Sequence, residues 1–133
     1  MGIYRRRDIT AQLIWDDLKM NGDSAKWQVC QRCSLTGPQF EYGKGFLLDE
    51  LQTRNGQPLI WQPRHGVYSL TQSEGDWLEY LLMWRLRSVA TQMRRIEQAA
   101  IAGGMRFGTS RKKIRLMIAS ITALRNMVEA MLP

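Results

Sequence analysis

The apolar residues of this chain change their spacing twice, and these changes limit the folds that it can adopt. Up to about residue 53 they recur at helical spacing, between residues 59 and 71 they alternate as in short strands, and from about residue 76 the helical spacing returns. The segment Pro63-Arg64-His65-Gly66 has the composition of a hairpin turn, so we expect strands over 59–62 and 67–71 on its two sides. The sequence therefore predicts a mainly α protein with one small β-hairpin.

Start and stop signals divide the part before the hairpin into three helices. We expect the first over residues 8–20, capped by Asp8, and a second from Asp23 or Ser24 to Cys33, with Trp27, Cys30 and Val29 as the candidates to face the core.

The third helix is expected after the short connection Ser34-Leu35-Thr36. Thr36 and Gln39 have the spacing of a capping box, and Pro38 suits a first helical turn. This helix would run to about Thr53, although Gly43 and Gly45 inside it cost roughly 1 kcal/mol each relative to alanine.

Two longer helices are expected after the hairpin, over about 76–102 and from Thr109 or Ser110 to Leu132, with a break at Gly103-Gly104. The first is apolar on two sides, and the second has apolar residues at alternating spacings of three and four. Because a helix that is apolar on two sides must be covered on both, we expect residues 76–133 to form a helical hairpin that also dimerises. The residues expected to make the dimer are Trp77, Leu81, Trp84, Ile114, Met117, Ile121, Leu124 and Val128.

The order helix, helix, tight turn, helix, β-hairpin, long helix resembles that of the winged-helix transcriptional regulators of the PadR-like and MarR-like kind. The resemblance covers about residues 8–102 and includes Tyr68-Ser69-Leu70-Thr71 with Gly75 close behind. It implies a winged helix-turn-helix domain over residues 1–75, followed by the C-terminal helical hairpin. It also implies sequence-specific binding of double-stranded DNA by a homodimer, either as a transcriptional repressor or at a replication or partition site.

The charge of the chain favours a polyanionic partner, either nucleic acid or an anionic membrane surface. The net charge is +7 and the pI is near 9.9. Residues 1–75 contain nine Lys/Arg and eight Asp/Glu, whereas residues 76–133 contain ten and four, so the excess lies in the second part. No apolar run reaches the roughly 18 residues of a membrane span, and no signal peptide is recognisable, so we expect a cytoplasmic protein.

The candidate DNA contacts come from four places. In the third helix, glutamine can pair with adenine, lysine with guanine or phosphate, and threonine and tyrosine with phosphate oxygens. The hairpin tip and the basic N-terminus could reach the minor groove or the backbone, although the N-terminus could equally be a solvated end. Cations around the start of the last helix oppose its dipole, which suggests an anion there, although a solvated surface is the alternative. The residues are Thr36, Gln39, Tyr42 and Lys44; Arg64 and His65; Arg5, Arg6 and Arg7; and Arg111, Lys112 and Lys113, with Arg106 and Arg115 beside them.

Catalytic and metal sites have little support in the sequence. The chain contains one histidine and no phosphate-binding or nucleophile motif, so we expect no enzyme and no cofactor. The pair Cys30 and Cys33 lacks the four ligands of a structural zinc site, and we expect no metal. The acidic pairs Asp16-Asp17 and Asp49-Glu50 are expected to be solvated.

Two other functions stay open. One is a protein-interaction module, such as an anti-repressor or adaptor, that uses the apolar C-terminal helices. The other is a binder of RNA or DNA shape that depends on the basic second part.

Overall fold

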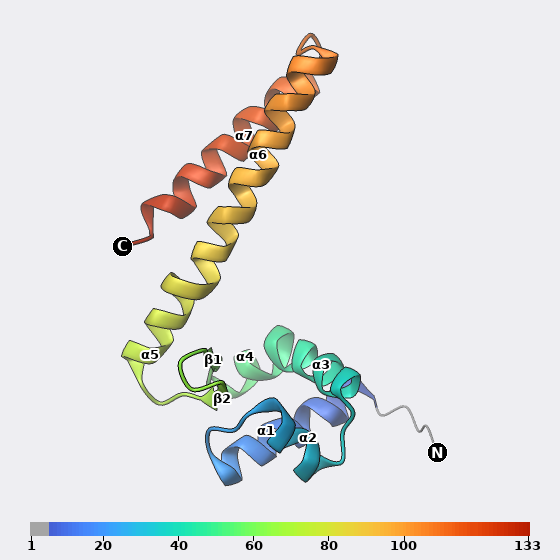
Figure 1. Ribbon diagram of the computed structural model, residues 1–133, viewed down its shortest axis with the longest axis vertical. Helices are drawn as coiled ribbons and strands as arrows, with labels where there is room; N and C mark the ends of the chain where they lie inside the picture. The colour runs from blue at the N-terminus through green and yellow to red at the C-terminus, as the bar shows by residue number, and fades with distance from the viewer. Residues whose placement is uncertain (1–5) are drawn as a thin grey trace. The chain divides into compact units, whose positions relative to one another are not determined.

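The computed structural model, which describes residues 6–133, divides after Trp77 into two compact units. Helices make up 74% of the chain, and the described strands form one two-stranded antiparallel hairpin, which confirms the mainly α prediction (Figure 1). The first unit contains α1 (Arg7–Asn21), α2 (Lys26–Cys33), α3 (Gly37–Phe46), the π-helical turn η1 (Leu47–Leu51), α4 (Gln52–Asn55), β1 (Leu59–Gln62) and β2 (Val67–Leu70). Then come α5 (Glu74–Glu79), the π-helical segment η2 (Tyr80–Leu86), α6 (Arg87–Phe107) and α7 (Lys112–Ala130).

The first two helices begin differently from the prediction. Arg6, not Asp8, is the N-cap of α1, and the Asp8 carboxylate accepts hydrogen bonds from the Ile9 N–H at 2.9 Å and from Arg6 at 2.8 Å. α2 begins after Ala25, whose N–H donates to the Gln28 side chain at 2.8 Å. Ser24 is not available as the cap because its backbone pairs with the β-hairpin.

Ser24 forms an isolated antiparallel bridge to the hairpin. Its N–H donates to the Tyr68 carbonyl at 3.1 Å, and its carbonyl accepts from the Tyr68 N–H at 2.8 Å. Within the hairpin, Leu59 pairs with Leu70 and Gln62 with Val67. The connection between α1 and α2 is thereby tied to β2, although about 40 residues separate the two in sequence.

The core of the first unit lies between α1, α3 and the hairpin. It is formed by Ala11, Ile14, Trp15, Leu18, Val29, Leu35, Phe40, Leu47, Leu51 and Leu59. Trp27 is 66% exposed, so its predicted burial is wrong, whereas Val29, also a candidate for the core, is fully buried. Cys30 and Cys33 are half-buried beside this core.

Gly43 is where α1 and α3 approach most closely. A Cβ atom at this position would lie 2.5 Å from Thr10 Cγ2, 2.9 Å from Thr10 Cβ and 3.1 Å from the Ala11 nitrogen. Thr10 and Ala11 are both buried. The glycine that weakens α3 as a helix therefore allows it to pack on α1.

A buried ion pair connects the first two helices. The Asp17 carboxylate in α1, with only 8% of its side chain exposed, accepts from Arg32 Nε at 2.9 Å and from a terminal guanidinium nitrogen at 2.8 Å. The same guanidinium donates to the Ser24 hydroxyl. The expectation of a solvated Asp17 is wrong because Arg32, from the next helix, covers it.

The second unit is a helical hairpin of α6 and α7, which lie side by side (Figure 1). The predicted break at Gly103-Gly104 is wrong, since α6 continues to Phe107 and ends at Gly108, where φ is +89°. Gly104 is buried, and a Cβ atom there would lie 3.0 Å from Thr109 Cγ2 and 3.5 Å from Ile118 Cδ1. It serves helix packing, whereas Gly108 makes the turn.

Among the described residues, no helix is long and apolar enough to cross a membrane.

Candidate nucleic-acid interface

The start of α3 is held by the capping box expected from the sequence. The Gln39 N–H donates to the Thr36 hydroxyl at 3.2 Å, and the Thr36 N–H donates to Gln39 Oε1 at 2.9 Å. The turn before it is tight because Ser34 adopts a left-handed conformation, with φ of +55°. Gln39 thus uses its amide oxygen inside the helix end, which leaves its amide NH2 as the group able to bond outward.

Lys44 lies between α3 and the hairpin rather than on the outer side of α3 expected from the sequence. Its ammonium is 2.7 Å from Glu41, donates to the Tyr68 hydroxyl at 3.1 Å and sits 5.2 Å from the centre of that ring. Burial lowers the pKa of Lys44, but these hydrogen bonds outweigh it and raise the pKa above its ordinary value. The lysine is therefore part of the packing between α3 and β2.

Glu41 joins Lys44 to a second lysine in α2. Its carboxylate is 3.1 Å from Lys26, so α2 and α3 are bridged across the tight turn. Burial raises the pKa of Glu41, but the bonds from Lys44 and Lys26 dominate and leave it below the ordinary carboxyl value. Sequence reasoning missed the role of Lys26, because the bridge depends on how α2 and α3 meet in space.

Tyr42 is the exposed aromatic residue of α3, with 61% of its surface accessible. Arg7 stacks on its ring at 5.2 Å, and Arg7 Nε donates to the Tyr42 carbonyl at 3.3 Å. Arg7 is therefore a residue of α1 packed on α3 and not part of an extended arm. Arg6 pairs with Asp8, and Arg5 lies outside the described residues.

The turn between β1 and β2 presents Arg64 and His65, and both are exposed as expected. Backbone bonds from His65 and Gly66 to the Gln62 carbonyl, at 3.1 and 2.8 Å, close the turn. Gly66 has φ of +64°, a conformation that favours glycine.

The two ends of the helix formed by α3, η1 and α4 differ in charge. Its first turn contains no acidic residue, whereas exposed Asp49 and Glu50 lie in η1. Asp49 contacts Arg7 at 3.4 Å, and Glu50 pairs with Arg54 at 3.2 Å. Near the N-terminal end, the carboxylate of Glu41 is paired with both Lys26 and Lys44, so this end is better suited than the acidic one to approach a phosphate backbone.

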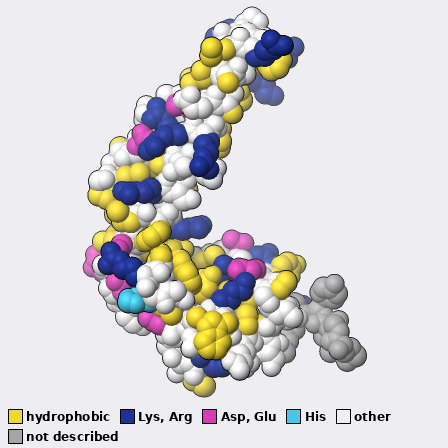
Figure 2. Space-filling view, viewed as in Figure 1, with side chains coloured by type: hydrophobic (Ala, Val, Ile, Leu, Met, Phe, Trp, Pro, Cys, Tyr) yellow, Lys and Arg dark blue, Asp and Glu magenta, His cyan; other side chains and the backbone are white. Residues whose placement is uncertain are grey.

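A second basic surface lies where α6 and α7 join, and Figure 2 shows lysine and arginine side chains gathered at that end of the hairpin. Arg106, Arg111, Lys112 and Lys113 are exposed there. Arg115 instead donates to the carbonyls of Thr109 and Ser110, at 2.8 Å each, and so holds the loop. We call the four exposed cations the tip cluster.

Between α6 and α7 lies a network of ion pairs that the sequence reasoning missed. Arg125 Nε is 2.9 Å from Glu97, which is 7% exposed, and Arg125 also bonds to Glu129 at 2.9 Å. Arg94 reaches Glu129 at 2.6 Å. Hydrogen bonds from Thr122 and then Arg125 lower the pKa of Glu97. The sequence contained a signal for this network: Glu97 in α6 and Arg125 in α7 each stand at a position where the helical spacing otherwise places apolar residues.

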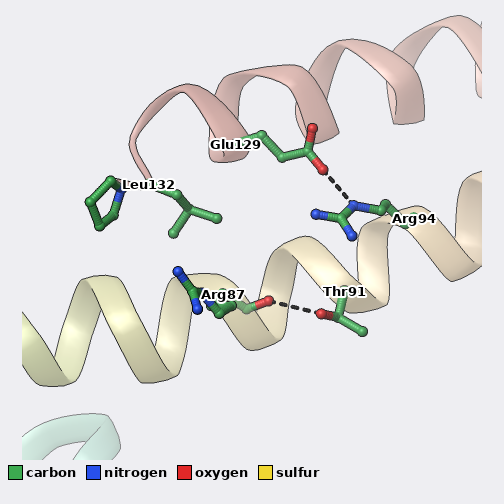
Figure 3. A pocket seen from close by; sticks show the side chains of 6 residues that line it. Arg87, Thr91, Arg94, Glu129 and Leu132 are labelled. Atoms are coloured by element: carbon green, nitrogen blue, oxygen red, sulfur yellow. Dashed lines mark hydrogen bonds and ion pairs between the residues drawn. The ribbon is translucent and has the colours of Figure 1, made fainter.

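An open pocket of about 450 Å³ lies beside this network (Figure 3). It is lined by Arg87, Thr91, Arg94, Glu129, Leu132 and Pro133. The Arg94 guanidinium points to Glu129, and the Thr91 hydroxyl donates to the Arg87 carbonyl at 3.1 Å, so these polar groups satisfy one another.

The cysteines show no feature of a reactive or metal-binding pair. Burial raises the pKa of the Cys30 thiol, which disfavours the thiolate. Within residues 6–133, no three histidine, cysteine or acidic residues are grouped as metal ligands.

Comparison with known proteins supplies no family for this chain: no protein-family model, curated protein or solved structure matches it.

Proposed function

We propose that the first unit is a winged helix-turn-helix and that the chain is a dimeric DNA-binding protein, acting in the cytoplasm as a repressor or at a replication or partition site. The observation that carries this proposal is the pairing of Ser24 with Tyr68. This pairing joins the connection between α1 and α2 to the β-hairpin. The hairpin itself follows α3, and α2, a tight turn and α3 come before it. This order of elements is the one in which a recognition helix is followed by a wing.

The N-terminal end of α3 is the part that would enter the major groove. In helix-turn-helix proteins the first residues of the recognition helix contact the bases, and a helix N-terminus attracts phosphate. Thr36, Gln39 and Tyr42 lie at this end, and the carboxylates of Asp49 and Glu50 lie two turns or more further along. Lys44 would act indirectly, since its bonds to Glu41 and Tyr68 join α3 to the wing.

Backbone contacts would come from the wing and from the tip cluster. Arg64 and His65 occupy the turn of the hairpin, where an arginine can enter a narrow minor groove. Lys112 and Lys113 stand in the first turn of α7, where cations oppose the helix dipole, and a bound phosphate would relieve this conflict.

The test is binding of the full-length chain to a labelled duplex of random sequence and to fragments selected from random DNA, over a series of salt concentrations. Gln39→Ala should weaken binding to selected fragments by about 1–3 kcal/mol and binding to random duplex much less. Arg64→Ala should weaken both. Arg54→Ala is the matched control, because Arg54 is an exposed arginine paired with Glu50 at the acidic end of the helix.

The tip cluster has its own readout in the same assay. The double variant Lys112→Ala, Lys113→Ala should reduce the slope of log affinity against log salt by about 1–2 and leave the sequence preference unchanged. An unchanged slope would remove the cluster from the interface. Binding that is no stronger than for an unrelated basic protein, and equal in all variants, would contradict DNA recognition by this unit.

A protein-interaction module is the second candidate, and the exposed apolar residues of the second unit favour it. Val89, Ile96, Leu124 and Met127 are each between 44% and 65% exposed. An adaptor that binds through apolar surface should keep its affinity as salt rises, whereas a DNA-binding protein loses affinity steeply.

A further inference from the structure

The α6–α7 hairpin leaves a continuous apolar surface uncovered, and we call it the open face. Its residues are Val89 and Ile96 of α6 and Met117, Leu124, Met127 and Met131 of α7. Each of them is between 44% and 65% exposed. Figure 2 shows hydrophobic side chains on the surface of this hairpin between its basic patches.

Helical spacing puts these residues on one side of the hairpin. Val89 and Ile96 directly precede Ala90 and Glu97, which are buried between the helices, and Met117, Leu124 and Met131 directly precede the half-buried Ile118, Arg125 and Leu132. One residue is a rotation of about 100° around the helix axis. Because α6 and α7 run antiparallel, the same rotation brings both sets to the same side, and the apolar surfaces of the two helices adjoin.

Between Met117 and Met131 the open face contains no charged residue, and Lys113, one turn before Met117 on the same side of α7, lies at its end. By their positions around the helices, the Arg94–Glu129 ion pair and the pocket around Arg87 and Thr91, which Figure 3 draws, lie on the other side of the hairpin. Other positions that continue the open face carry no charge, namely Gln92, Ala99, Gly103 and Ser120. Apart from Lys113 at its end, this surface is uncharged and largely apolar across two helices, so most of it can approach an identical surface without bringing cations together.

The hairpin alone also lacks a core. Among its described residues only Ala90, Glu97 and Gly104 are buried, and none of these is a large apolar residue. Two helices are half of a four-helix bundle, which buries one apolar stripe of each helix at its centre. The second apolar stripe of α6 and α7 therefore needs a further layer of helices.

We propose that this layer is the open face of a second copy, so that two hairpins form a four-helix bundle around a two-fold axis. Each of the six side chains leaves on the order of 100 Å² exposed, and with the small residues beside them this approaches the roughly 800 Å² per partner of a standard interface. A two-fold axis buries the same surface of both copies, which suits a face with no charge to complement. The inference specifies the dimer contact of the proposed function and does not depend on DNA binding.

This assignment differs from the sequence prediction of the dimer. Ile114, Ile121 and Val128 are half-buried along the side of α7 that faces α6, whereas Met117 and Leu124 belong to the open face. Trp77, Leu81 and Trp84 precede α6 and are not needed for the bundle.

Sedimentation of the full-length chain at about 1–100 μM tests the proposal, with the helical content of every variant checked by circular dichroism. The parent should be a dimer, and Leu124→Arg should weaken association at least tenfold, because the two-fold axis brings both new charges into one apolar layer. Asn126→Arg is the matched control, since it places the same charge on the other side of α7, and it should remain a dimer. Should Leu124→Arg unfold, the milder Leu124→Ala should still weaken association measurably.

A monomeric parent would overturn the open face as the interface. So would a dimer that is as stable in the Leu124→Arg and Leu124→Ala variants as in the Asn126→Arg variant. An oligomer larger than a dimer would overturn the two-fold bundle. Binding of the same samples to duplex DNA separates the two proposals. A monomeric parent that binds DNA contradicts the bundle and the dimeric state in the proposed function, but not DNA recognition by the first unit. A dimeric parent that fails to bind DNA contradicts the proposed DNA binding and leaves the bundle intact.

Discussion

Replacing Gly43 by alanine tests the close approach of α1 and α3 that shapes the first unit. An added Cβ atom would lie 2.5 Å from Thr10 Cγ2 and 2.9 Å from Thr10 Cβ, and Thr10 is 1% exposed, so the contact cannot be relieved by turning a side chain into solvent. Overpacking of this kind costs about 1–3 kcal/mol, and alanine returns roughly 1 kcal/mol of helix propensity. Because two contacts are this short, we expect a net loss of about 1–2 kcal/mol.

Gly45, two residues further along α3, is the matched control. A Cβ atom there would meet only the guanidinium end of Arg7, at 3.0 Å, and that end can move. Gly45→Ala should therefore stabilise the chain by about 0.5–1 kcal/mol, since the gain in helix propensity is not offset. The same substitution in the same helix is thus expected to have opposite signs at the two positions.

Urea unfolding followed by tryptophan fluorescence measures both effects, at one protein concentration because association adds stability. The Thr10→Ala background provides a further check, since it removes the methyl group at 2.5 Å and should reduce the loss caused by Gly43→Ala. If Gly43→Ala raises the unfolding midpoint as Gly45→Ala does, the close approach of α1 and α3 at Thr10 is refuted.

Two further predictions concern ion pairs. Arg32→Ala should destabilise the chain by about 1–2 kcal/mol, because it removes the side chain that covers Asp17 and donates two hydrogen bonds to its carboxylate, whereas Arg54→Ala at an exposed pair should change stability by less than about 1 kcal/mol; equal effects in urea unfolding would contradict this. The pKa of Glu97 is lowered by Thr122 and Arg125, and that of Glu129 mainly by Arg94. Both carboxylates therefore stabilise the fold at pH values above 4.5, the ordinary carboxyl pKa. This stabilisation is lost as the pH falls through the lower pKa values of the folded state. The Tm should fall from about pH 5 to pH 3, and Glu97→Gln, measured by thermal unfolding, should flatten that dependence; parallel curves for parent and variant would contradict it.

The sequence predicted best those features that depend on neighbouring residues. The capping box of Thr36 and Gln39 and the turn at residues 63–66 are local, and both occur as expected. The environment of Lys44 depends on Tyr68, which lies 24 residues further along, and spacing within α3 could not reveal it. The burial of Asp17 likewise depends on Arg32 in another helix.

Glycine was the least informative residue type in the sequence, because it serves two different purposes here. Gly43 and Gly104 sit inside helices where another helix or a loop approaches, and Gly108 ends α6 with a positive φ. A pair of glycines such as Gly103-Gly104 predicts a break when only local conformation is considered. The helix continues through it because packing at Gly104 favours a residue without a side chain.

The helical hairpin shows why apolar spacing alone could not identify its inner side. α7 has two stripes at alternating spacings of three and four; one contains Arg125 in its middle, and the other, with Met117, Leu124 and Met131, is uncharged after Lys113 at its start. An uninterrupted apolar stripe is ordinarily taken as the buried one, yet here the stripe with the charge faces α6, because Glu97 occupies the opposing position. A slip of one turn would separate Glu97 from Arg125 and leave a carboxylate buried without a partner, so this pair fixes the register of α6 against α7. The open face contains no such pair, and its partner must therefore be selected by shape and apolar area.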